Sequence, residues 1–186
     1  NFSTMVVEDR NWRIKEISDL KTAIRRGDTG LQRVLLRAIV AICYAHWEGY
    51  VKFSARKYLE HIALRKFQYE ALDKQFFRNY FLPRLASLSV SKTSITERCA
   101  LIDEILLSSN NRFARANDDL VNTKSNLNFE VFTDICIVCG IPIAHFSDKS
   151  NFIDLALLKR RNSIAHGEDT LVAIDNLEEI AAGTIE

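Results

Sequence analysis

The sequence predicts a globular protein with an all-α fold, and three observations support this. Apolar residues recur at helical spacing along most of the 186-residue chain. Only six glycines and two prolines are present, which is few for an all-β protein with its many turns. Apolar residues make up 47% of the chain and charged residues 26%, as in ordinary globular proteins. We therefore predict one all-α domain over residues 1–186.

Two helices are predicted in the N-terminal third. Apolar side chains at helical spacing indicate a first helix over Phe2–Arg26, with a start near Asp9. A break at Arg25–Gly30 precedes a long helix that runs from Leu31 to about Leu59. Gly49 interrupts this helix at a cost of about 1 kcal/mol relative to alanine, which indicates close packing of another backbone.

The middle of the chain predicts two more helices and a connector. An aromatic-rich helix over Lys66–Phe81 should end at Pro83. Its aromatic side chains are interpreted as core or dimer contacts, with stacking of nucleobases as the alternative. A polar connector, Ser87–Ser94, leads to a helix over Ile95–Leu107, whose inward face is predicted to carry Leu101, Ile102, Ile105 and Leu106. Residues 108–126 are the most loop-like part of the chain.

Three helical segments are predicted in the C-terminal third. Asn126-Leu127-Asn128 should cap a helix over Phe129–Cys139, which Gly140 ends. An apolar helical run follows at Phe152–Leu158, and Asp175 can cap a last helix. The apolar residues of this last helix are Leu177, Ile180 and Ala181.

The cysteines and the charge restrict the possible ligands. Cys136 and Cys139 have the spacing of a zinc pair, but no second pair or histidine cluster completes a four-ligand set, so no metal and no cofactor is predicted. Four scattered cysteines indicate a reduced, cytoplasmic setting. No apolar run approaches the roughly 20 residues that span a bilayer. With a net charge of +1, any phosphate binding requires a local patch.

One short stretch, Leu158–Gly167, carries the strongest chemical signal. If its helix continues to His166, then Asn162 and His166 stand four residues apart on one face, beside Arg161. Gly167 sits where a left-handed residue would close the helix. A guanidinium, a carboxamide and an imidazole at one helix end suit a phosphate and a proton transfer. The structural alternative is a set of cations that the helix dipole favours.

A second string, His46-Trp47-Glu48-Gly49-Tyr50-Val51-Lys52, lies in the long second helix. Glu48 and Lys52 are predicted to form an i,i+4 ion pair, and a surface salt bridge beside a tight helix crossing would explain both. The two strings lie about 110 residues apart. In that order, Trp-Glu-Gly-x-x-Lys and Arg-Asn-x-x-x-His resemble the HEPN superfamily, small all-helical domains that include many metal-independent ribonucleases.

The resemblance implies a HEPN-like antiparallel helical bundle, with extra helices and a loop in the middle, and an endoribonuclease activity. In such enzymes the ribose 2′-OH attacks the neighbouring phosphate and leaves a 2′,3′-cyclic phosphate. His166 would serve as base or acid, Arg161 would stabilise the charged phosphate, and Asn162 would orient the imidazole or bind the phosphate.

Four further residues have supporting roles in this resemblance. Glu48 would position the arginine of the motif, and Lys52 would support the site beside it. Lys159 and Arg160, the two cations that precede the motif, would contact the RNA.

The resemblance also implies partners. These are RNA (tRNA or mRNA), a second copy in a homodimer with a composite active site, and an antitoxin or defence-system protein. In HEPN toxins that pair with a nucleotidyltransferase, a tyrosine two positions after the histidine is modified. Glu168 occupies that position here, so this control is not expected. The alternatives are a non-catalytic HEPN module that binds RNA, nucleotide or a protein, and a structural scaffold.

Overall fold

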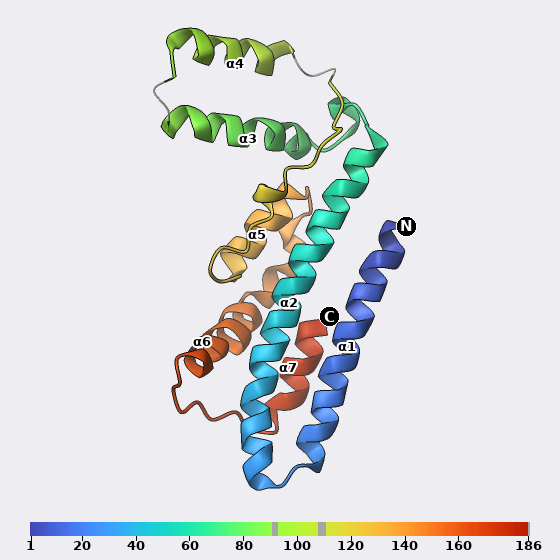
Figure 1. Cartoon of the computed structure of the whole chain (residues 1–186), viewed down its shortest axis with the longest axis vertical. Helices are drawn as coiled ribbons and strands as arrows, with labels where there is room; N and C mark the ends of the chain where they lie inside the picture. Colours follow the sequence, from blue (N-terminus) through green and yellow to red (C-terminus); the bar gives the residue numbers. More distant parts are fainter. Residues whose placement is uncertain (91–92, 108–110, 186) are drawn as a thin grey trace. The chain divides into compact units, whose positions relative to one another are not determined.

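The computed structural model describes residues 1–90, 93–107 and 111–185. Over these ranges the chain is helical and contains no strand, and a single isolated bridge joins Gln68 and Arg112 (Figure 1). The predicted all-α class is confirmed. Contacts divide the chain into two compact units: unit 1 comprises residues 1–54, 123–132 and 144–186, and unit 2 comprises residues 55–122 and 133–143. The prediction of a single domain stays a prediction.

Unit 1 combines the N-terminal helices with the C-terminal segments. They are α1 (Phe2–Arg26), most of α2 (Thr29–Arg65), the start of α5 (Phe129–Val138), the 3-10 helix η4 (Ile143–Lys149), the π-helix η5 (Phe152–Lys159), α6 (Arg160–Ala165) and α7 (Asn176–Ile185).

Local caps explain where the first two helices begin. The Asn1 side chain accepts a hydrogen bond from the backbone N–H of Thr4 at 3.1 Å, so α1 starts at Phe2. The predicted start near Asp9 is wrong, because that carboxylate pairs with Arg13 inside the helix. Asp28 accepts from the N–H of Leu31 at 2.9 Å and thereby starts α2, which shortens the predicted break.

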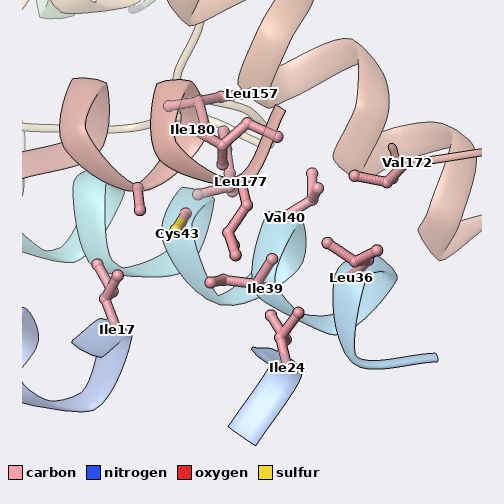
Figure 2. Close-up of a cluster of buried hydrophobic side chains, with 12 residues drawn as sticks. Ile17, Ile24, Leu36, Ile39, Val40, Cys43, Leu157, Val172, Leu177 and Ile180 are labelled. Atoms are coloured by element: carbon pink, nitrogen blue, oxygen red, sulfur yellow. The ribbon is translucent and has the colours of Figure 1, made fainter. Parts of the chain in front are cut away.

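The core of unit 1 collects side chains from α1, α2, η5 and α7 and from the segment between α6 and α7 (Figure 2). Each fully buried Ile or Leu contributes about 1.5–3 kcal/mol relative to exposure. The three apolar residues predicted for the last helix are all part of this core. The buried members are Ile17, Ile24, Leu36, Ile39, Val40, Cys43, Tyr44, Leu157, Val172, Leu177, Ile180 and Ala181.

The contact between α7 and η5 requires a glycine. A Cβ atom on Gly183 would lie 2.5 Å from Cζ of Phe152, whereas one on Gly30 would find its nearest neighbour, a side-chain oxygen of Asp28, at 3.6 Å. We expect Gly183→Ala to lower the free energy of unfolding by about 1–3 kcal/mol through overpacking. Gly30→Ala should raise it by up to about 1 kcal/mol, because alanine favours the helix.

Urea unfolding followed by circular dichroism measures both glycine variants against the wild type. Equal midpoints for Gly183→Ala and the wild type would contradict the close contact with Phe152.

The segment before α6 is a π-helix, where the sequence predicted an ordinary apolar helical run. The carboxylate of Asp154 accepts a hydrogen bond from the N–H of Phe129 at 2.7 Å, which holds η5 against the start of α5. This bond joins residues 25 positions apart, so local spacing does not reveal it. π-Helical turns are rare and occur frequently at functional sites.

Unit 2 contains the end of α2, the 3-10 helix η1 (Tyr69–Ala71), α3 (Lys74–Val90), α4 (Ile95–Leu107), the 3-10 helix η3 (Asp118–Leu120) and the end of α5. The predicted connector over residues 108–126 is confirmed for 111–126, where η3 is the one short helix of the described part. Residues 108–110 lie outside the described ranges.

The predicted helix over Lys66–Phe81 is wrong at both ends. Lys66 has a left-handed backbone with φ of 52°, which stops a helix there. Pro83 lies inside α3, although proline removes one hydrogen bond of the helix. Beyond this proline, Arg84 pairs with Glu104 of α4 and helps to hold the helix. Because α3 extends to Val90, residues 87–90 of the predicted polar connector are helical. Residues 91 and 92 lie outside the residues that the structure describes.

The aromatic side chains of this region form a cluster, as the core interpretation predicted. The ring centroids of Phe76 and Phe113 lie 5.3 Å apart, and those of Tyr69 and Phe77 lie 5.4 Å apart, both with edge-on geometry. The buried members of the cluster are Tyr69, Phe76, Phe81 and Phe113.

The helix α4 has the predicted bounds, but not the predicted inward face. Leu101 is buried, whereas Ile102 and Leu106 are exposed and Ile105 is half-buried. The helix α5 begins where Asn128 accepts from the N–H of Val131 at 2.8 Å, as predicted.

The long helix α2 is apolar enough, by length and composition alone, to cross a membrane. Core helices of globular proteins pass the same test. In unit 1 this helix contributes Ile39, Val40 and Cys43 to the core, so the test does not show that the helix spans a membrane.

Candidate functional site

The motif helix ends as the sequence predicted. His166 terminates α6, and Gly167 has a left-handed backbone with φ of 78°. The N–H of Gly167 donates to the carbonyl of Ile164 at 3.1 Å, and the N–H of Glu168 donates to that of Ser163 at 3.0 Å. These two bonds are a Schellman closure, which satisfies the last carbonyls of the helix. The imidazole of His166 is thereby presented at a defined helix end.

The guanidinium of Arg161 is held on two sides. Its Cζ atom lies 4.1 Å from the ring centroid of Tyr44, a cation–π contact with α2. Its Nη1 atom donates a hydrogen bond of 2.9 Å to Oδ1 of Asn162. The side chain is half-buried, so these contacts fix its plane while part of the donor fork stays accessible.

Tyr44 is the platform that sequence reasoning missed. The residue is 2% exposed, and its hydroxyl accepts a hydrogen bond of 2.7 Å from the N–H of Leu127. Burial raises the pKa of Tyr44, and the negative charge of the neighbouring Glu48 raises it further. One signal was available in the sequence: Tyr44 precedes Glu48 by four residues and so shares its helix face.

Glu48 and Lys52 lie on α2 as predicted, but their contacts differ from the expectation. Glu48 is near enough to the Tyr44 hydroxyl for its negative charge to raise the pKa of that group. In the described part of the chain no ion pair joins Glu48 to Lys52, and none joins it to Arg161. The predicted Glu48–Lys52 pair is therefore wrong.

Asn162 and His166 lie on one face of α6. The backbone N–H of His166 donates to the carbonyl of Asn162 at 2.9 Å. The side-chain oxygen of Asn162 is occupied by Arg161, which leaves its NH2 group for a ligand. The imidazole of His166 is exposed and makes no side-chain hydrogen bond within the residues that the structure describes. It is accessible to a ligand at the helix end.

The two cations before Arg161 differ in placement. Lys159 is exposed, which suits contact with a polyanion. Arg160 is half-buried, and its Nη1 atom is buried without a hydrogen-bond partner in the described structure. The predicted contacts of both residues with RNA remain predictions.

Two arginines of α2 hold the chain that follows the motif, and the sequence analysis did not identify them. Arg37 donates from Nη1 to the carbonyl of Glu168 at 2.9 Å and to that of Thr170 at 3.3 Å. Arg33 forms an ion pair with Asp169 at 2.7 Å. These contacts join residues more than 130 positions apart, so no local pattern indicates them.

Gly49 makes room for a side chain rather than for a backbone, which corrects the prediction. A Cβ atom there would lie 2.7 Å from Nη1 of Arg13 on α1. The same guanidinium donates to the carbonyl of His46 at 3.2 Å and pairs with Asp9. His46 is buried with its Nε2 2.6 Å from Glu16, and burial lowers the pKa of its imidazole. This group joins α1 to α2.

The described residues contain no group of three or more His, Cys, Asp or Glu side chains placed to hold a metal ion. Burial raises the pKa of Cys136 to about 11 and that of Cys139 to about 12, so both thiols stay protonated. A cavity of about 310 Å³ lies in unit 2, where it is lined by Asn79, Tyr80, Pro83, Phe113, Arg115 and Asn117. It includes none of the predicted site residues.

One comparison with known proteins finds a relationship. The family model described as RiboL-PSP-HEPN matches residues 8–185, a range that includes both motifs. No curated protein and no solved structure matches the chain.

Proposed function

Because this chain belongs to the RiboL-PSP-HEPN family, we propose that it is an endoribonuclease that works without a metal ion. One observation supports this most strongly. The guanidinium of Arg161, near the start of α6, is oriented on Tyr44 and bound to Asn162, and the exposed imidazole of His166 follows at the end of the same short helix. A fixed cation and an accessible acid–base group are the two kinds of side chain that cleavage of a phosphodiester by its own 2′-OH requires.

The chemistry assigns one task to each side chain. A neutral imidazole of His166 removes the 2′ proton while the 2′ oxygen forms a bond to phosphorus. Arg161 donates hydrogen bonds to the phosphoryl oxygens as negative charge builds on them. The bond from phosphorus to the 5′ oxygen then breaks, and that oxygen takes a proton from a second acid. The products are a 2′,3′-cyclic phosphate and a 5′-hydroxyl.

The second acid is the reason to propose a dimer. The motif supplies a single histidine, and a proton donor is needed while His166 acts as base. A homodimer that brings two motifs into one composite site would supply the His166 of a second copy. We further propose a cytoplasmic role in a toxin–antitoxin or antiphage-defence system, with RNA as substrate and a neutralising protein partner.

Cleavage of end-labelled RNA in EDTA tests the proposed activity. The full chain is incubated with an RNA and with a DNA of the same sequence. We expect fragments from the RNA alone, with 3′ ends that resist phosphatase until acid opens the cyclic phosphate. Cutting of DNA, or cutting that requires added Mg²⁺, would overturn the mechanism. Retardation of RNA without cleavage would favour the non-catalytic binding module, which the exposed imidazole and the net charge of +1 also fit.

A further inference from the structure

The helix α4 presents an apolar stripe to solvent. Ile95 is 79% exposed, Ile102 is 56% exposed and Leu106 is 73% exposed, and Cys99 between them is also exposed. Their spacing is four, three and four residues, which places all four on one helix face. Large apolar side chains that gather on one exposed face indicate a binding surface.

The remaining contacts of α4 hold it in place within unit 2. Leu101 is buried, and Glu104 pairs with Arg84 of α3, beside which α4 runs in Figure 1. At the start of α4, the side-chain oxygen of Ser94 accepts a hydrogen bond of 3.2 Å from the backbone N–H of Glu97. In return, the carboxylate of Glu97 accepts a hydrogen bond of 2.8 Å from the backbone N–H of Ser94. This capping box and the contacts with α3 order the helix before any partner binds, so little entropy is lost on association.

The stripe has the spacing of a coiled-coil seam. Ile95 and Ile102 occupy d positions of a heptad, and Cys99 and Leu106 occupy a positions. Short seams of this kind form helix pairs when the flanking charges are complementary, because ion pairs between the e and g positions determine the partner and its orientation.

The flanking charges select a second copy of the same helix. Arg98 occupies g and Asp103 occupies the next e position, and neither has an ion-pair partner in the part of the chain that the structure describes. In a parallel pair, each g residue faces the e residue five positions later in the other helix. Arg98 therefore meets the partner's Asp103, and twofold symmetry forms the same pair again. An antiparallel pair would place Arg98 near its own copy, and Asp103 likewise.

We propose that α4 is a self-association surface, on which two copies of this chain pair their α4 helices in parallel. The inference goes beyond the proposed ribonuclease, because it uses residues of unit 2 alone and requires no cleavage. Two heptads form a small interface, so the dimer belongs to the weak, concentration-dependent class. Residue 99 lies opposite its own copy in this arrangement.

Cross-linking at Cys99 tests the pairing in the full chain. The other three cysteines are buried, so a short bis-maleimide should join two chains through Cys99. We expect a covalent dimer whose yield rises with protein concentration and disappears in Cys99→Ser. The variant Ile102→Cys in that background should restore it, because residue 102 also faces its own copy. In an antiparallel pair, residue 99 of one chain would instead face residue 102 of the other. A cross-link that forms only when the wild type is mixed with the Cys99→Ser, Ile102→Cys variant would therefore show antiparallel helices and overturn the proposal.

Charge exchange tests the predicted ion pairs. Arg98→Asp places two aspartates opposite each other in each pair, and we expect the cross-linked yield to fall at least about fivefold. Arg98→Asp with Asp103→Arg should restore the yield. Arg115→Asp changes the same charge on another exposed residue of unit 2 and should have no effect. Equal yields of cross-linked dimer from all of these variants would overturn the proposal. A dimer that forms only through the motif of unit 1 would also overturn it, and in that case Cys99 would not be cross-linked.

Discussion

His166→Ala is expected to reduce RNA cleavage in EDTA by about 10²–10⁴-fold, the usual contribution of a positioned acid–base group. The imidazole is exposed and ends α6, so its removal deletes the proton-transfer group without opening the core. The backbone bonds that close the helix at Gly167 do not involve this side chain and should persist. Initial rates on end-labelled RNA, measured at equal protein concentration, give the ratio.

The matched control is His145→Ala. His145 is also exposed in unit 1 but lies in η4, outside the motif, and its removal should leave the rate unchanged. Both variants should unfold within about 0.5 kcal/mol of the wild type, as surface substitutions usually do. A His166→Ala protein that is folded and cuts RNA at the wild-type rate would show that the activity resides elsewhere or in a contaminant.

Local sequence signals predicted the helices better than they predicted the ends of the helices. The bounds of α4 could be predicted because its capping box, Ser94 with Glu97, lies within four residues. The bounds of α3 could not, since the helix begins only at Lys74, where the Asp73 side chain accepts from the N–H of Gln75, and it continues past Pro83. The exposed stripe of α4 was also missed, because periodicity shows that a face is apolar but not what covers it.

The motif itself could be predicted to the residue, but its support could not. The spacing of Asn162 and His166 and the left-handed Gly167 follow from helix geometry, which is local. Tyr44 could not be placed from the sequence, because its contact with Arg161 joins residues 117 positions apart. The same holds for Arg37, which binds the chain after the motif.

The glycine of the second string shows the limit of a correct local inference. A glycine inside a helix indicates that something approaches closely, and this proved true at Gly49. What approaches is the guanidinium of Arg13 from α1, and no property of the string His46–Lys52 specifies a side chain rather than a backbone. The string therefore serves two purposes: Gly49 lets Arg13 of α1 pack against α2, and the charge of Glu48 acts on Tyr44, the residue on which Arg161 stacks.

Arg161→Lys is expected to lower the cleavage rate by about 10²–10³-fold, although the positive charge is kept. A guanidinium presents a planar fork that stacks on the Tyr44 ring and bonds Asn162 while it donates to phosphate. An ammonium is a point charge that cannot reproduce this geometry. Because stabilisation of the phosphorane is lost rather than binding of the substrate, the loss should fall on kcat more than on KM.

The control is Arg26→Lys, the same change at an exposed residue in the last turn of α1, which should leave both constants unaltered. If Arg161→Lys raised KM alone and left kcat intact, Arg161 would be an electrostatic anchor for RNA rather than a stabiliser of the transition state. The fixed orientation of Arg161 on the ring of Tyr44 favours the role of transition-state stabiliser. A side chain that only attracts a polyanion gains nothing from a guanidinium held in one plane.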